Sequence, residues 1–243
     1  MHPRRRCWWS HVGGLLQLSA GRCTTAQLDE PPLRALGFAL PLVIKPIRGR
    51  GSQGVTVVRT LEALRAAAAS LLAGGEHDAE KQYGSRLMVE PYLPGEELTL
   101  AVMPPGRYRI GGEWRTHDRH WALPPVRRTG HHDGVTPYSG NIPVSANSTA
   151  MTPAQCAAPA AMKVSAECAR AAELIGGRAP VRIDCRMSEA GEYVLFDLNM
   201  KPNMTGAGRP GRDGQDSLVL LAARAIGWSY GDLLVNMLDQ AWS

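Results

Sequence analysis

Residues 182–205, RIDCRMSEAGEYVLFDLNMKPNMT, constrain the fold more strongly than any other part of the chain. They predict two short strands joined by a polar turn. Because side chains alternate between the two faces of a strand, Arg182 and Asp184 share one face of the first strand. By the same rule, Asp197 and Asn199 share one face of the second strand. A short connection can bring both pairs to the same side of the hairpin.

The opposite face of this hairpin is predicted to be apolar. Its members are Ile183, Cys185, Met187, Val194, Phe196 and Leu198. The polar face, joined across the turn Ser188–Gly191, gathers two carboxylates, one amide oxygen and one guanidinium. Hard divalent cations such as magnesium prefer oxygen ligands and often share them with substrate phosphates. The segment alone leaves two interpretations open: a magnesium site, or a surface hairpin with solvated charges.

A glycine-rich loop lies within residues 41–58, PLVIKPIRGRGSQGVTVV. An apolar strand, Leu42–Ile44, ends at Lys45, and a second strand is predicted at Val55–Val58. The loop matches G-x-G-x-x-G, but a strand follows it where the dinucleotide fingerprint requires a helix, so nicotinamide binding is excluded. A glycine loop between strands can instead cover a phosphate chain with its N–H groups, with Lys45 adding a charge. A plain turn is the alternative.

A third segment, RLMVEPYLPGEELTLAVM at residues 86–103, predicts strand, Pro-Gly turn and strand. Glu90 lies at the end of the first strand. Glu97 and Thr99 share one face of the second. An acidic residue that enters a strand after a tight turn can hold ribose hydroxyls, and an exposed edge charge is the alternative.

In this order and spacing, the three segments together resemble the ATP-grasp superfamily, and within it the D-alanine–D-alanine ligase branch. VIKPIRGRGSQGV is similar to the phosphate-covering loop, VEPYLPGEELT to the adenine and ribose segment, and RID with FDLNMKPNMT to the metal-binding strand pair. The resemblance covers residue 41 to the C-terminus. It implies an α+β ATP-grasp fold of two lobes with ATP held between them. The nucleotide-covering lobe is expected at 41–103, and the metal and substrate lobe at 107–243.

The resemblance also implies roles for individual residues in nucleotide binding. The implied phosphate-binding groups are Lys45, Ser52 and the loop backbone, including Gly51 and Gly54. Adenine contacts fall to Glu90 and to the backbone of Tyr92 and Leu93, and ribose contacts to Glu97.

The same resemblance assigns magnesium, or manganese in its place, to Asp184, Asp197 and Asn199. Arg182 and Lys45 are the implied catalytic residues, with Arg182 stabilising the transferred phosphoryl group. The implied reaction joins a small carboxylate to an amine, such as an amino acid, through an acylphosphate. The alternative is a non-catalytic ATP-binding remnant or subunit of the same fold.

This chain departs from the family pattern in places that bear on the substrate. Asp197 stands where the family usually has glutamate, and Asn203 replaces the glycine of the usual Pro-Gly turn. Residues 206–211 carry no serine for a substrate carboxylate. Arg209 or Arg212 is the alternative anion ligand.

The rest of the chain fits a cytoplasmic enzyme. The net charge of +5 comes without a basic stripe interleaved with aromatics, so nucleic-acid binding is not expected. The apolar run near the start is too short for a membrane span. Five scattered cysteines predict free thiols in a reducing compartment. Residues 1–40 are expected to be a truncated or foreign start, and a homodimer is left open.

Helices are predicted at Leu61–Ala73 after an N-cap at Thr60, from Thr152-Pro153 to about Gly176, and at 216–226 and 232–242. Residues 114–148 form a long segment rich in histidine and arginine. Its histidine spacings match no compact zinc pattern. The segment is interpreted either as a cover over the active site or as an exposed excursion.

Overall fold

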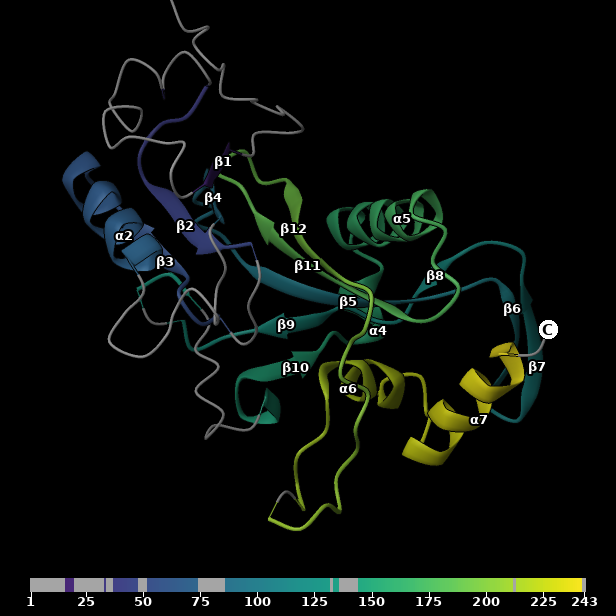
Figure 1. Ribbon diagram of the computed structural model, residues 1–243. Helices are drawn as coiled ribbons and strands as arrows, with labels where there is room; N and C mark the ends of the chain where they lie inside the picture. Colours follow the sequence, from purple (N-terminus) through teal and green to yellow (C-terminus); the bar gives the residue numbers. More distant parts are fainter. Residues whose placement is uncertain are drawn as a thin grey trace, which may run out of the picture. The chain divides into compact units, whose positions relative to one another are not determined.

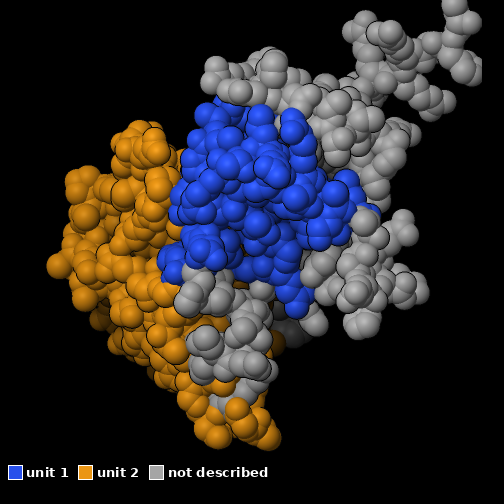
Figure 2. All heavy atoms as spheres, turned by 90° about the vertical axis from the view of Figure 1, so that its left-hand side faces the viewer, with its two compact units in different colours: residues 1–92, 131–139 blue, residues 93–130, 140–243 orange. Residues whose placement is uncertain are grey.

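The computed structural model describes residues 16–19, 33, 37–47, 52–73, 86–131, 133–135, 144–211 and 213–241. They fall into two compact units, which Figure 2 colours separately: unit 1 is residues 1–92 with 131–139, and unit 2 is residues 93–130 with 140–243. The division between Tyr92 and Leu93 comes earlier than the sequence predicts. The strand at Glu97–Met103 belongs to unit 2 because it pairs with three strands of that unit.

Unit 1 contains a four-stranded antiparallel sheet in the order β1-β4-β2-β3. The strands are β1 (Leu16–Ser19), β2 (Leu42–Pro46), β3 (Thr56–Val58) and β4 (Arg86–Pro91). Helix α2 (Leu61–Ala73) begins after Thr60, whose hydroxyl accepts a hydrogen bond from the Ala63 amide at 3.1 Å, as predicted. The helix packs on one face of the sheet through Leu64 and Ala68, where Ile44 and Val89 are fully buried.

Unit 2 is built on a larger antiparallel sheet in the order β10-β9-β5-β11-β12, with β8 paired to β5 (Figure 1). The strands are β5 (Glu97–Met103), β8 (Trp121–Ala122), β9 (Val126–Arg128), β10 (Ser148–Ala150), β11 (Val181–Met187) and β12 (Tyr193–Asn199). Helix α5 (Pro159–Leu174) covers one face and α6 (Leu218–Arg224) covers part of the other. Both faces of β5 are therefore buried along most of its length.

A hairpin, β6 (Gly106–Ile110) and β7 (Glu113–His117), extends from this sheet and packs against α7 (Tyr230–Ala241). A 3₁₀ turn at Val144–Asn147 leads into β10. The closing helices α6 and α7 lie within two residues of their predicted starts and end slightly earlier than predicted.

The helix predicted from Thr152 to about Gly176 is wrong as a single helix. The chain forms two helices, α4 (Pro153–Cys156) and α5. Thr152 is the N-cap of α4 and forms a capping box there. Proline lacks an amide hydrogen and is tolerated at the first turn of a helix, so Pro159 ends one helix and begins the next.

The β11–β12 hairpin contains a β-bulge between Asp184 and Cys185 that the strand pattern did not predict. The bulge places Leu195 opposite Cys185, so Leu195 and Tyr193 pack in the apolar core beneath α5. The prediction that Val194 and Phe196 share this face is therefore wrong, because one extra residue in a strand reverses the faces of those that follow. Val194 is exposed.

No helix among the described residues is both long enough and apolar enough to cross a membrane.

We predict that Gly95→Ala destabilises the protein. A Cβ at position 95 would lie 2.6 Å from Cβ of Met187 and 2.7 Å from its carbonyl oxygen, in the turn that leads into β5. Overpacking of this kind costs about 1–3 kcal/mol. Urea unfolding is the measurement. Gly214→Ala is the matched control, because nothing lies within 4 Å of its Cβ position, and an unfolding free energy lowered equally by both substitutions would contradict the prediction.

Candidate functional site

One face of the unit 2 sheet carries a concentration of charged side chains. In the register of β11 and β12, Asp184 lies opposite Asp197 and Arg182 opposite Asn199. The shared polar face predicted for these four residues is confirmed. The face continues onto β5, where Thr99 lies opposite Asp184.

Asp184 is a buried carboxylate of this face, with 9% of its surface exposed. The Thr99 hydroxyl donates to its Oδ1 at 2.7 Å, and the Arg182 guanidinium donates to its Oδ2 at 3.0 Å. Burial raises the pKa of Asp184, Arg182 and Thr99 act to lower it, and Asp197 raises it further. The carboxylate is thus held by two donors in a place where its charge is costly.

The donor set of the hairpin fits a hard divalent cation. Asp197 is exposed, and Asn199 is half-buried with its Oδ1 accepting a hydrogen bond from the Lys201 amide at 2.9 Å. Two carboxylates and an amide oxygen are ligands that magnesium accepts. Within the described ranges, no three His, Cys, Asp or Glu side chains cluster closely enough to hold a metal by themselves. A cation here would draw its remaining ligands from phosphate and water.

Two more arginines lie on the same face: Arg186, which the sequence did not indicate, and Arg128, which belongs to the histidine- and arginine-rich segment interpreted as a cover over the active site or an exposed excursion. Nε of Arg186 donates to the Gly95 carbonyl at 3.1 Å, and its Nη1 lies 4.0 Å from Oε2 of the buried Glu97. Arg128 on β9 lies opposite Glu97 in the strand register. The sequence signal was a strand ending in Val-Arg-Arg, but the pairing of β9 with β5 is not readable from local pattern.

In unit 1, the face of the sheet that points away from α2 carries Lys45 and Glu90. Nζ of Lys45 lies 2.7 Å from Oε1 of Glu90, and the two side chains are 16% and 10% exposed. Their diagonal placement follows from the register, in which Val43 pairs with Glu90 and Lys45 with Met88. The residues predicted to contact phosphate and adenine therefore form an ion pair in this structure.

The described end of the glycine loop has left-handed backbone at two positions. Ser52 has φ 57° and Gly54 has φ 74°, and a Cβ at Gly54 would lie 2.9 Å from Cγ of Pro46. Gly51, predicted to contact phosphate, lies outside the described residues. The turn thus requires glycine at position 54 for both conformation and space.

The predicted adenine segment crosses the boundary between the units. The Tyr92 amide donates to the Pro41 carbonyl at 3.1 Å, within unit 1. The Tyr92 ring lies against Gly134, where an added Cβ would be 2.8 Å from it. Leu93 is the first residue of unit 2.

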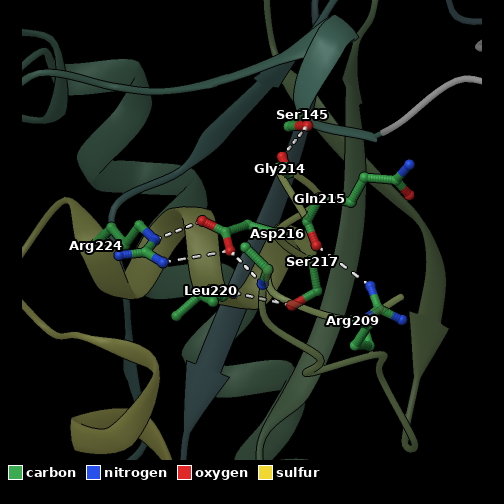
Figure 3. Close-up of polar contacts among 9 residues, drawn as sticks. Ser145, Arg209, Gly214, Gln215, Asp216, Ser217, Leu220 and Arg224 are labelled. Atoms are coloured by element: carbon green, nitrogen blue, oxygen red, sulfur yellow. Dashed lines mark hydrogen bonds and ion pairs between the residues drawn. The ribbon is translucent and has the colours of Figure 1, made fainter. Parts of the chain in front are cut away.

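Arg209, one of two arginines proposed for a substrate anion, is used within its own loop (Figure 3). Its Nε donates to the Gly206 carbonyl at 3.0 Å. Its Nη2 donates to the Gln215 carbonyl at 3.3 Å, as Figure 3 shows. Asp216 at the end of the loop pairs with Arg224 of α6. Arg209 therefore ties together the two ends of the loop. Arg212 lies outside the described residues.

The histidines of the 114–148 segment have structural partners where the structure describes them. The His117 ring stacks on Trp121 with centroids 4.2 Å apart and planes inclined by 10°. Nε2 of His120 lies 2.7 Å from the Gly177 carbonyl oxygen. His132 lies outside the described residues.

The mixed α+β fold matches solved ligases. The D-alanine–D-alanine ligase from Coxiella burnetii aligns with a TM-score of 0.62 and 16% identity, over 93% of this chain and 51% of that one. The Bacillus anthracis ligase, solved in complex with ATP, aligns with a TM-score of 0.59 and 19% identity, over 94% of this chain and 58% of that one.

The sequence comparisons agree. The family described as "D-ala D-ala ligase C-terminus" matches residues 33–239. A D-alanine–D-alanine ligase of Brucella anthropi is 30% identical over 207 residues, covering 83% of this chain and 56% of the relative. One from Ralstonia nicotianae is 28% identical over 96% of this chain and 60% of the relative. The chain thus belongs to the D-alanine–D-alanine ligase C-terminal (ATP-grasp) family, and it spans somewhat over half the length of these relatives.

We predict that Thr99→Val destabilises the protein by about 1–3 kcal/mol, because it removes a buried donor from the Asp184 carboxylate without a large change in volume. Thr149→Val, on the exposed side of β10, should change stability by less than about 0.5 kcal/mol. Urea unfolding at neutral pH compares the two, and equal stabilities would show that the Thr99 hydroxyl is not needed.

His117 should make stability fall in mild acid. Burial and the neighbouring Arg115 lower its pKa below 6.5 in the folded chain. As pH falls below 6.5, the unfolded chain takes up this proton first, so folding loses stability until the folded-state pKa is reached. His117→Phe keeps a ring against Trp121 and should flatten the curve of unfolding free energy against pH between 5 and 7. An unchanged slope would contradict the assignment.

Proposed function

We propose that the chain is the ATP-using part of a carboxylate–amine ligase that acts through an acylphosphate. The observation that carries the proposal is the polar face of β11 and β12, where Asp184 lies opposite Asp197 and Arg182 opposite Asn199. Family membership and the fold support it. This chain spans somewhat over half the length of the relatives that it matches, so their activity is attributed to it only as part of the proposal.

Each unit supplies a different part of the proposed chemistry. In unit 1, Lys45 and the turn at Ser52–Gly54 contact the phosphates of ATP, and Glu90 and the Tyr92 backbone contact adenine. When nucleotide binds, Lys45 either leaves its ion pair with Glu90 to contact the phosphate, or contacts both groups at once.

In unit 2, Glu97 contacts ribose, and Asp184, Asp197 and Asn199 hold magnesium. Bound magnesium supplies positive charge that neutralises phosphoryl oxygens. Thr99 fixes the Asp184 carboxylate in place before any metal binds. Arg182, ion-paired with Asp184, donates hydrogen bonds to the phosphoryl group as it is transferred.

The proposed reaction has two steps. The substrate carboxylate attacks the terminal phosphorus of ATP, giving an acylphosphate and ADP. An amine then attacks the acyl carbon, loses a proton, and expels inorganic phosphate. Positioning of the reactants can supply roughly 7–11 kcal/mol of barrier reduction in such a reaction.

We predict that ATP binding depends on magnesium through Asp197. Removing magnesium from the wild type, or replacing Asp197 with Asn, should each weaken ATP at least tenfold, because the phosphates lose their shared cation. Isothermal calorimetry with and without magnesium is the measurement. Asp239→Asn, on the exposed side of α7, is the control and should bind as the wild type does. Equal magnesium-dependent binding by Asp197→Asn and the wild type would refute the metal assignment.

A phosphate-release assay with D-alanine and other amino acids, with dipeptide followed by mass spectrometry, separates the two candidate functions. Dipeptide formed by this chain establishes a ligase. ATP binding or slow hydrolysis without dipeptide supports the non-catalytic ATP-binding alternative. The substrate is proposed only as a small carboxylate and an amine, such as amino acids.

A further inference from the structure

Arg128 is a cation on the polar face of unit 2 for which the described residues provide no partner. It lies opposite Glu97 of β5 and opposite Ser148 of β10 in the strand register. Within the described part of the chain, no hydrogen bond or ion pair engages its guanidinium, and its Nε is buried without an acceptor.

The other two arginines of this face are placed differently. Arg182 donates to Asp184 at 3.0 Å, and Arg186 donates to the Gly95 carbonyl at 3.1 Å. Arg128 has Glu97 and Asp184 near enough to favour its charge, while burial and Arg182 disfavour it and together lower its pKa. The carboxylates of Glu97 and Asp184 thus stabilise the positive charge of Arg128 without accepting hydrogen bonds from its N–H groups.

A guanidinium has five N–H donors and remains protonated in proteins. Leaving such donors buried and unsatisfied is costly, so folded chains normally provide acceptors for them. Nε of Arg182 is also buried without a partner. Two arginines on one sheet face therefore have donors available for acceptors that the described residues do not provide.

The missing acceptors match a phosphoryl group. Arginine binds phosphate oxygens with two parallel N–H···O bonds, and two arginines suit a doubly charged group. The carboxylates of Asp184 and Asp197 would repel a bare anion, but a divalent cation shared with phosphate removes that repulsion.

We propose that Arg128 binds phosphoryl oxygens of the ligand, as a second arginine beside Arg182. The identification of that ligand as ATP rests on the proposed function, whereas the anion chemistry rests on the arginine itself. The phosphoryl group has two sources, the nucleotide and free inorganic phosphate, and the experiment includes both.

A ligand-binding role and a structural role for Arg128 predict different changes in the Tm of the ligand-free chain when this side chain is replaced. A structural arginine stabilises the ligand-free chain, so its removal lowers the Tm. Arg128 is half-buried, and its Nε is buried without a partner among the described residues. If its partner arrives with the ligand, replacing Arg128 by an apolar side chain of similar length leaves the Tm unchanged or raises it.

The test compares Arg128→Met with Arg127→Met. Arg127 is the next residue along β9, but it pairs with Glu96 away from the polar face, so it controls for the loss of an arginine from this strand. The measurements are the ligand-free Tm, the rise in Tm with inorganic phosphate and magnesium, and calorimetric affinities for magnesium-ATP and adenosine.

For Arg128→Met we expect an unchanged or higher Tm, no phosphate-induced rise, at least tenfold weaker ATP binding and unchanged adenosine binding. Arg127→Met should keep all ligand responses of the wild type. If Arg128→Met binds ATP and phosphate as the wild type does, the inference is overturned while the proposed function stands. A lower Tm with equal losses for ATP and adenosine also overturns it, since that is the structural outcome.

If the wild type itself does not bind ATP, the proposed function fails. The inference about Arg128 is then tested only by the rise in Tm with inorganic phosphate and magnesium. A phosphate response that is present in the wild type and lost in Arg128→Met supports the inference. The absence of any response in the wild type overturns it.

Discussion

The antiparallel pairing of β5 with β11, and of β11 with β12, is the constraint on which unit 2 depends. Because these strands alternate their side chains, one face buries Leu100 and Ile183 beneath α5, while the other carries the acids and arginines. A shift of one residue in any of the three strands would exchange the faces. The apolar core therefore fixes where each charge lies, and removing charge from the polar face would leave the core able to form.

Asp184 shows how this arrangement reconciles burial with charge. A buried carboxylate without donors would protonate or destabilise the fold. The Thr99 hydroxyl and the Arg182 guanidinium satisfy one oxygen each, so the group stays in place with its position set by neighbouring strands. Arg128 on the same face is the contrasting case, a buried donor whose acceptor is absent from the described residues. The contrast between a satisfied carboxylate and an unsatisfied guanidinium is the basis of the proposal that this face binds an anionic ligand.

Unit 1 follows the same rule with a smaller core. One face of its sheet packs on α2, and the other carries the pair Lys45–Glu90. The pair neutralises Lys45, the lysine proposed to bind phosphate, and so lowers the cost of holding its charge at a half-buried position. Under the proposed function, a nucleotide competes with Glu90 for the lysine, which favours a more highly charged ligand.

Local pattern alone determined much of this protein. Alternation placed Arg182 with Asp184 and Asp197 with Asn199, and capping chemistry placed the start of α2 at Thr60, because both depend on neighbours within a few residues. The order of three short motifs indicated the family. Tertiary structure decided what depends on distant pairing. The bulge after Asp184 moved Leu195 in place of Phe196 into the core, and Pro159 divided one predicted helix into two. The pairing of β9 with β5 brought Arg128 to the polar face, since hydrogen bonding between strands far apart in sequence leaves no local signal.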